Sequence, residues 1–283
     1  MKTGTLVIAI AVTSLIGFTA CKKTDSTAQN DKDEIATTIE LSTDQAISDN
    51  LTEDANDIFM NAATEKGLTE ERPLEPFQST GVLGCAEVTV STTAGFPKTI
   101  VIDFKTGCTD AHGITRKGKI NIILSDFLRK KGSTAVLTFD GYYVNDFKKE
   151  GTITWTNNST ASVKGWERKV ENGKITAPTG KYWMHSGIKN VVQTAGYDTP
   201  LNLLDDAYSV TGNNSVTNSN NITRTSAILI ALEKRTICEN ISKGSIELKG
   251  PKHSAIVDFG NGDCDKVATI AIDGGTPITF LLR

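Results

Sequence analysis

The sequence has little of what metalloenzymes and nucleic-acid-binding proteins usually need. Histidine occurs only 3 times in 283 residues, which limits metal coordination and general-base chemistry. The formal net charge is -3, so the chain has no excess of basic residues from which a nucleic-acid-binding surface could form. We therefore expect no nucleic-acid partner and little scope for metal chemistry based on histidine.

Motifs of the common catalytic sites are also missing. The chain has no G-x-S-x-G, H-E-x-x-H, C-x-x-C or Walker-type loop. Asp205 and Asp206 are the carboxylate pair that a hydrolase might use, but adjacent residues of a strand point to opposite faces. We therefore expect a non-enzymatic binding or assembly module. The alternative is an envelope or extracellular hydrolase acting on glycan or peptide polymers.

The first 20 residues are typical of an export signal. Lys2 supplies the positive charge, and the apolar stretch 6–20 is shorter than the roughly 20 residues that a membrane span needs. The end of this stretch, from Phe18 to Cys21, resembles a bacterial lipobox, in which a peptidase cuts before an acylated cysteine; the usual residue at position 18 is leucine. We predict a signal peptide over 1–20 and a lipid anchor (palmitate) on Cys21. The alternative is a plain secretory signal followed by an incidental cysteine.

Four cysteines remain after Cys21, an even number, as expected in an oxidising compartment. Two stretches, 85–110 and 238–265, share a pattern of apolar residue, Val or Ile, Asp, Phe, glycine turn and cysteine. Counting back from the turn of each hairpin places its first cysteine close to its last. The sequence thus predicts the disulfides Cys85–Cys108 and Cys238–Cys264, each closing its own hairpin and contributing about 3 kcal/mol.

The polar segment 21–41 has few apolar residues, so we predict a flexible tether there. An amphipathic helix is predicted over 42–67, with Ser42 as its cap and Gly67 after its last turn. Its apolar residues recur at helical spacing: Ile47, Leu51, Ala55, Ile58, Phe59 and Ala62. The opposite side carries Asp49, Glu53, Asp54 and Asp57. This acidic side is interpreted as solvated, with an acidic docking face as the alternative.

Residues 68–283 are predicted to form a single antiparallel β domain. Apolar residues alternate with polar ones, and turn signals recur at short intervals. Asn172-Gly173 is the strongest hairpin signal. Thr199-Pro200 predicts one or two helical turns before a strand over 208–211, and segment 212–225 is an exposed hairpin or a mobile loop. The fold class is therefore all-β, an antiparallel sheet or sandwich of short strands and hairpins, with one N-terminal helix packed on it.

Aromatic residues offer one candidate binding surface. Around Trp183, rings occupy both faces of the strand, because Tyr182 and Trp183 are adjacent. Trp166 lies between charged residues in a similar segment. Exposed rings of this kind stack on sugars or peptides. The alternative is that Trp166, Tyr182 and Trp183 are core residues.

A second candidate is a calcium loop formed by Asp258, Asn261, Asp263 and Asp265, because Ca²⁺ is bound by several oxygen ligands. No glutamate follows at EF-hand spacing. The alternative is a turn at a strand end, where Asp and Asn are common. No other cofactor is indicated.

The whole mature chain resembles a group of uncharacterised lipoproteins of Bacteroidetes-type bacteria. The residues that carry the resemblance are 20–23, the run 96–108, and 197–202 with 205–208. The resemblance implies an all-β fold and a place in the cell envelope, as an outer-membrane lipoprotein facing the periplasm or the surface. It implies no activity. The expected partners are the membrane, through the lipid anchor, and a glycan or an envelope protein.

Overall fold

A computed structural model describes residues 26–70, 81–92, 94–160, 162–197 and 203–282. Within these ranges the chain forms one long helix, a short 3-10 helix and the strands of a 14-stranded sheet. The bounds are α1 (Ser26–Glu65), β1 (Glu87–Val90), β2 (Lys98–Asp103), β3 (Cys108–Thr109), β4 (Thr115–Leu124), β5 (Thr134–Val144), β6 (Phe147–Asn157), β7 (Gly165–Thr176), β8 (Tyr182–Ala195), η1 (Leu203–Asp205), β9 (Ala207–Asn218), β10 (Thr223–Arg235), β11 (Lys243–Lys249), β12 (Ser254–Asn261), β13 (Val267–Ile272) and β14 (Ile278–Leu281).

The sheet is an antiparallel meander. Its strand order follows the sequence from β1 to β14, except that the two-residue strand β3 pairs with the end of β4 beside β2. The all-β prediction is confirmed. The central strands are longer than predicted, since β8 has 14 residues and β10 has 13. The result is one extended sheet rather than a set of short hairpins.

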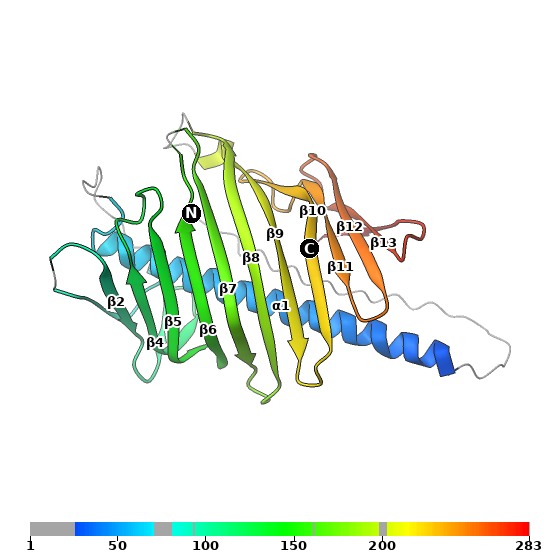
Figure 1. Ribbon diagram of the computed structural model, residues 1–283, viewed down its shortest axis with the longest axis horizontal. Coiled ribbons are helices and arrows are strands. Elements are labelled where there is room, and N and C mark those ends of the chain that lie inside the picture. The colour runs from blue at the N-terminus through cyan, green and yellow to red at the C-terminus, as the bar shows by residue number, and fades with distance from the viewer. Residues whose placement is uncertain (1–25, 71–80, 93, 161, 198–202, 283) are drawn as a thin grey trace.

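Helix α1 runs obliquely across one face of this sheet, which we call the closed face (Figure 1). The apolar positions of the helix, including Ile58 and Phe59, are fully buried against it. The strands supply the other side of the core through alternate residues, such as Ile120 and Ile122 of β4. We call the opposite face, which the helix does not cover, the open face.

The helix begins earlier than the sequence predicted. Segment 26–41 was expected to be tether, but it belongs to α1. Glu34 is 9% exposed, and its Oε1 accepts a hydrogen bond of 3.2 Å from the backbone N–H of Lys252. Ser42 is no cap, because its hydroxyl donates to the Thr38 carbonyl inside the helix, at 2.8 Å. Segment 26–41 is thus helical although it has few apolar residues, and its residue Glu34 contacts the β11–β12 turn.

The end of the helix agrees with the prediction. Gly67 has a φ of +65°, and the N–H of Leu68 donates to the carbonyl of Ala63 at 2.8 Å. This is the C-terminal capping arrangement for which glycine is preferred, since other L-residues rarely adopt a positive φ.

The hairpin predicted at Asn172-Gly173 is wrong. Both residues lie inside β7, at a bulge opposite β8, and Asn172 has a φ of +51°. Glycine is required beside it for space, because a Cβ atom at Gly173 would lie 2.5 Å from Nε2 of His185. The signal therefore marks close packing on the closed face rather than a turn.

The predicted helical turns before β9 appear in the described residues as η1, while residues 198–202 lie outside them. Strand β9 extends to Asn218, well beyond the predicted strand over 208–211. Segment 212–225 forms an ordered β9–β10 hairpin, in which Thr217 pairs with Thr223. Of the two interpretations of this segment, the exposed hairpin is confirmed and the mobile loop is not.

Both predicted disulfides are present. The Cα atoms are 5.7 Å apart for Cys85–Cys108 and 5.1 Å apart for Cys238–Cys264. The first bond lies at the β1–β3 end of the sheet and the second beside β11 and β12, near the other end. The two related segments are thus closed separately and are far apart in the strand order.

Candidate functional site

Two residues of the acidic side of α1, Glu53 and Asp54, form ion pairs with the sheet. Arg168 of β7 donates to both carboxylate oxygens of Glu53, with 2.7 Å between Nη1 and Oε2. Lys189 of β8 adds a contact of 3.1 Å between Nζ and Oε1. Burial would raise the pKa of Glu53, but the hydrogen bonds and charges of Arg168 and Lys189 lower it to about 2. Glu53 is thus an ion-pair partner of the sheet, while its side chain stays 45% exposed to solvent.

A second ion-pair group lies nearer the first edge of the sheet. Arg116 of β4 is 2% exposed and bridges Asp54 of α1 and Asp110. Its Nε is 3.1 Å from Oδ2 of Asp54, and its Nη1 is 2.6 Å from Oδ2 of Asp110. Tyr142 donates to the same Asp54 oxygen at 3.2 Å. A buried guanidinium is satisfied here by two carboxylates, which is a structural role.

Single polar contacts join the helix to the central strands. The Nζ of Lys149, which is 1% exposed, donates to Oγ1 of Thr52 at 3.0 Å. Burial, together with the charge of Arg168, lowers the pKa of Lys149 to about 7. Lys181 is 2.7 Å from Asp44. These polar contacts on the closed face hold α1 in place.

The three candidate aromatic residues do not share a surface. Trp183 is 1% exposed and lies in the closed-face core, where its Nε1 donates to Oγ of Ser48. Trp166 also packs against that core, with its ring centroid 6.0 Å from that of Tyr208. Only Tyr182 is on the open face, 39% exposed, with Nζ of Lys174 4.8 Å from its ring. The predicted aromatic platform is therefore wrong, since Trp183 and Trp166 pack in the core.

The calcium candidates line one surface hollow at β12 and β13, which includes Asp258, Asn261, Asp263 and Asp265. Two of them act in turns: Asp258 accepts the N–H of Gly260 at 2.8 Å, and Asp265 accepts that of Val267 at 3.0 Å. In the described part of the chain, no three His, Cys, Asp or Glu side chains form a group that could hold a metal ion. The geometry agrees with the turn interpretation.

The carboxylate pair of the hydrolase alternative is divided between two environments. Asp205 is exposed, whereas Asp206 is 6% exposed. Asp206 accepts hydrogen bonds of 2.8 Å from Nε2 of Gln193 and from the hydroxyl of Tyr208. Burial and this bond raise the pKa of Tyr208 to about 12. Asp206 therefore fixes the β8–β9 connection and is not paired with Asp205 for acid–base work.

The open face changes in character across the sheet. On the β2–β7 side it carries cross-strand or same-strand ion pairs, such as Lys119–Asp103 at 3.2 Å and Lys169–Glu171 at 2.7 Å. On β8, β9 and the first half of β10, the open-face positions carry no charged residue. These positions are Tyr182, Met184, Ser186, Ile188, Asn190, Val192, Ser209, Thr211, Asn213, Ser215, Thr217, Thr223, Thr225 and Ala227. We call this region the uncharged strip.

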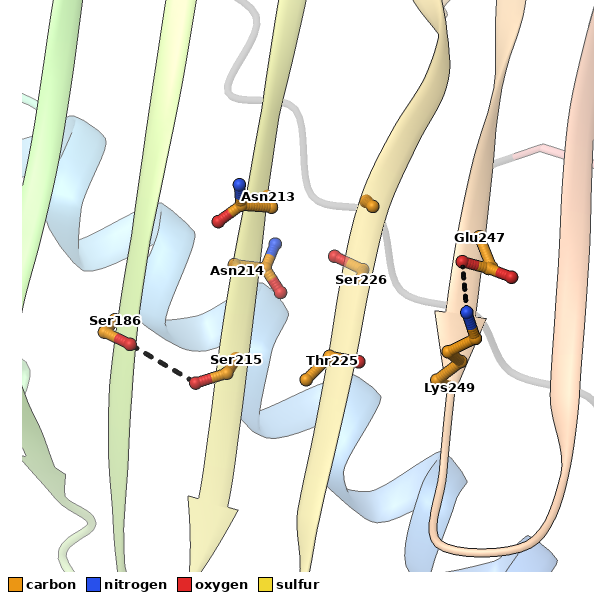
Figure 2. A pocket seen from close by; sticks show the side chains of 9 residues that line it. Ser186, Asn213, Asn214, Ser215, Thr225, Ser226, Glu247 and Lys249 are labelled. Carbon is orange, nitrogen blue, oxygen red and sulfur yellow. Dashed lines mark hydrogen bonds and ion pairs between the residues drawn. The ribbon is translucent and has the colours of Figure 1, made fainter.

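The uncharged strip and the neighbouring strand β11 together form a hollow of about 380 Å³. Figure 2 shows its side chains on four neighbouring strands, with α1 behind the sheet. The lining residues are Ser186, Asn213, Asn214, Ser215, Thr225, Ser226, Ala227, Glu247 and Lys249. The sequence analysis missed this site. Its signal was the Asn, Ser and Thr content of segment 212–225, which is also typical of loops.

No family model, curated protein or solved structure matches this chain. Cys21 and the predicted signal peptide lie outside the described residues. None of the helices in the described part of the chain is both long and apolar enough to cross a membrane.

Proposed function

We propose that the protein is an exported, lipid-anchored module of the cell envelope that binds a partner on the open face of its sheet. One observation carries the proposal. The closed face is occupied by α1, whereas the open face presents a hollow lined by hydrogen-bonding side chains from β8 to β11. A hollow of about 380 Å³ is within the range of ligand sites in proteins.

The location rests on two separate features. Two disulfides indicate an oxidising, non-cytoplasmic compartment. The lipobox-like stretch ending at Cys21 supports an anchor in the outer membrane. Cys21→Ala tests the anchor: we expect the variant to move from the membrane fraction to the soluble fraction. Unchanged membrane partition would contradict the anchor and leave the binding proposal to its own test.

The binding proposal is tested with isolated cell envelopes and the full chain carrying Cys21→Ala, so that the lipid anchor does not contribute to envelope binding. Ser215→Arg places a large charged side chain in the middle of the hollow, and we expect it to weaken envelope binding by about tenfold or more. The matched control is Thr138→Arg, which makes the same change on the open face of β5, outside the hollow. Equal binding by wild type and both variants would show that the hollow takes no part.

A further inference from the structure

We propose that the hollow on β8–β11 is a binding site for a neutral oligosaccharide. This inference rests on the proposed function and names the ligand class of the same site. Three features support it: the charge of the strip, the arrangement of its side chains in rows, and the pairing of its backbone.

The charge of the site fits a neutral ligand. On β8, β9 and the first half of β10 the open-face positions are uncharged, although charged pairs occur on the strands to either side. The two charged residues of the hollow, Glu247 and Lys249, are 2.9 Å apart and neutralise each other. For a polyanion the hollow offers only Lys249, and for a polycation only Glu247, and each of these is already paired with the other. Such a site gives no net electrostatic attraction to either.

The register places seven of the lining side chains, together with Ile188 beside the hollow, in two rows across the strands. The first row is Ser186, Ser215, Thr225 and Lys249, which are consecutive cross-strand partners. The second row, two residues along each strand, is Ile188, Asn213, Ala227 and Glu247. Strands lie about 4.8 Å apart, and residues two apart in a strand are separated by about 6.8 Å. Hydrogen-bonding groups are thus repeated on the scale of a single sugar ring.

The rows combine polar and apolar groups as a sugar ring does. The hydroxyls of Ser186 and Ser215 are 3.2 Å apart, and both can donate and accept. Asn213 adds an amide with two donors and an acceptor. Ala227, between Asn213 and Glu247 in the second row, presents only a methyl group. The hydroxyl groups of a bound sugar would form hydrogen bonds with the polar side chains, and its C–H groups would pack on the methyl group of Ala227.

The position of the hollow argues against an extended peptide. A peptide that adds a strand needs a sheet edge with unpaired backbone groups. Strands β8, β9 and β10 are interior, and each pairs with a neighbour on both sides. Ligand contacts at the hollow are therefore made by side chains, which suits a ligand that carries its own donors and acceptors on every residue.

The test is calorimetric titration of full-length protein with four neutral probes: maltohexaose, cellohexaose, chitohexaose and mannohexaose. We expect at least one of them to bind. Its Kd should change less than about twofold between about 50 mM and about 500 mM NaCl, because the oligosaccharide carries no charge that salt could screen. Asn213→Ala should weaken that binding by about fivefold to tenfold, since an amide that bonds the ligand is lost. Ser215→Arg should weaken it by about tenfold or more.

Thr138→Arg is again the control and should bind within about twofold of wild type. The ligand class is rejected if wild type binds none of the four probes, or if Ser215→Arg binds as well as wild type. It is also rejected if heparin binds in their place with strong salt dependence. Loss of envelope binding in Ser215→Arg, combined with no oligosaccharide binding by wild type, would retain the proposed function and reject the sugar. If Ser215→Arg binds envelopes as well as wild type does, and wild type binds no oligosaccharide, both the proposed binding function and the sugar ligand are rejected.

Discussion

The indole of Trp183 donates a hydrogen bond to the hydroxyl of Ser48, with 2.8 Å between Nε1 and Oγ. Trp183 is on β8 and Ser48 is on α1, so the bond crosses the interface between the helix and the sheet. The preceding residue, Tyr182, is on the open face and 39% exposed. Two adjacent aromatic residues thus have opposite roles, one in the core and one at the surface.

This relationship predicts different effects for the two rings. Trp183→Ala should lower the free energy of unfolding by about 3–5 kcal/mol, because it removes a buried ring and leaves a cavity. Tyr182→Ala, on the same strand, should change it by less than about 1 kcal/mol. Urea unfolding followed by circular dichroism measures both. Similar losses in the two variants would contradict the assignment of faces.

Glu53 predicts how stability changes in acid. Its pKa is about 2 in the folded protein and is ordinarily 4.5, so its contribution is complete above pH 4.5 and is lost as the pH falls from 4.5 towards 2. Glu53→Gln should therefore be less stable than wild type at pH 7, by about 1 kcal/mol, because the buried Arg168 loses its charged partner while solvent around the half-exposed Glu53 screens the pair. The difference should shrink between pH 4.5 and 2.

The control for Glu53 is Glu171→Gln, which removes the exposed pair with Lys169. Such pairs contribute about 0–1 kcal/mol, so this variant should remain close to wild type at neutral pH. Chemical denaturation over a pH series separates the two variants. A pH-independent difference between wild type and Glu53→Gln would show that the carboxylate charge is not the cause.

Lys149 predicts a change of the same sign, a rise of stability with pH, but at neutral to alkaline pH. Its pKa is about 7 in the folded protein and ordinarily 10.5. Between these values the unfolded chain binds the proton and the folded chain does not, so wild-type stability rises with pH. Lys149→Met removes this rise. We expect its stability relative to wild type to be highest below pH 7 and to decline towards pH 10.

Lys148→Met is the control for Lys149, because Lys148 lies on the open face and pairs with Glu150 at 2.9 Å. Its stability relative to wild type should have no comparable slope between pH 7 and pH 10. Unfolding at pH 6, 8 and 10 is sufficient for the comparison. Parallel curves for Lys149→Met and wild type would mean that Lys149 stays charged in the fold.

The disulfides predict two separate losses of stability. The loops that they close span 23 and 26 positions, so each bond should contribute about 3 kcal/mol. Cys85→Ala combined with Cys108→Ala should cost about this amount, and so should the corresponding pair at Cys238 and Cys264. Peptide mapping without reductant should recover only these two pairings. A peptide joining Cys85 to Cys238 would contradict the fold.

The features predicted well from the sequence are those determined by neighbouring residues. Gly67 ends the helix because its positive φ is a local requirement, and each disulfide closes a hairpin whose two strands follow one another. The all-β class likewise follows from the alternation of apolar and polar residues. These signals do not depend on which distant element packs against them.

The errors occur where a distant element decides the outcome. Glu34 is helical and buried beside Lys252, which lies near the other end of the chain. Asn172-Gly173 has the composition of a turn, but Gly173 provides space for His185 of the next strand. Glu53 has the composition of a solvated surface, but Arg168 lies opposite. The local sequence around a residue does not show which distant residue will pack against it.

The meander has a consequence for how the chain assembles. Because strands adjacent in the sheet are also adjacent in sequence, each can pair as soon as the next one is available. Helix α1 is different: it precedes the whole sheet in sequence, yet its partners range from Arg116 of β4 to Lys252 in the β11–β12 turn. Its apolar side therefore stays without its packing partners until more than half of the sheet has formed.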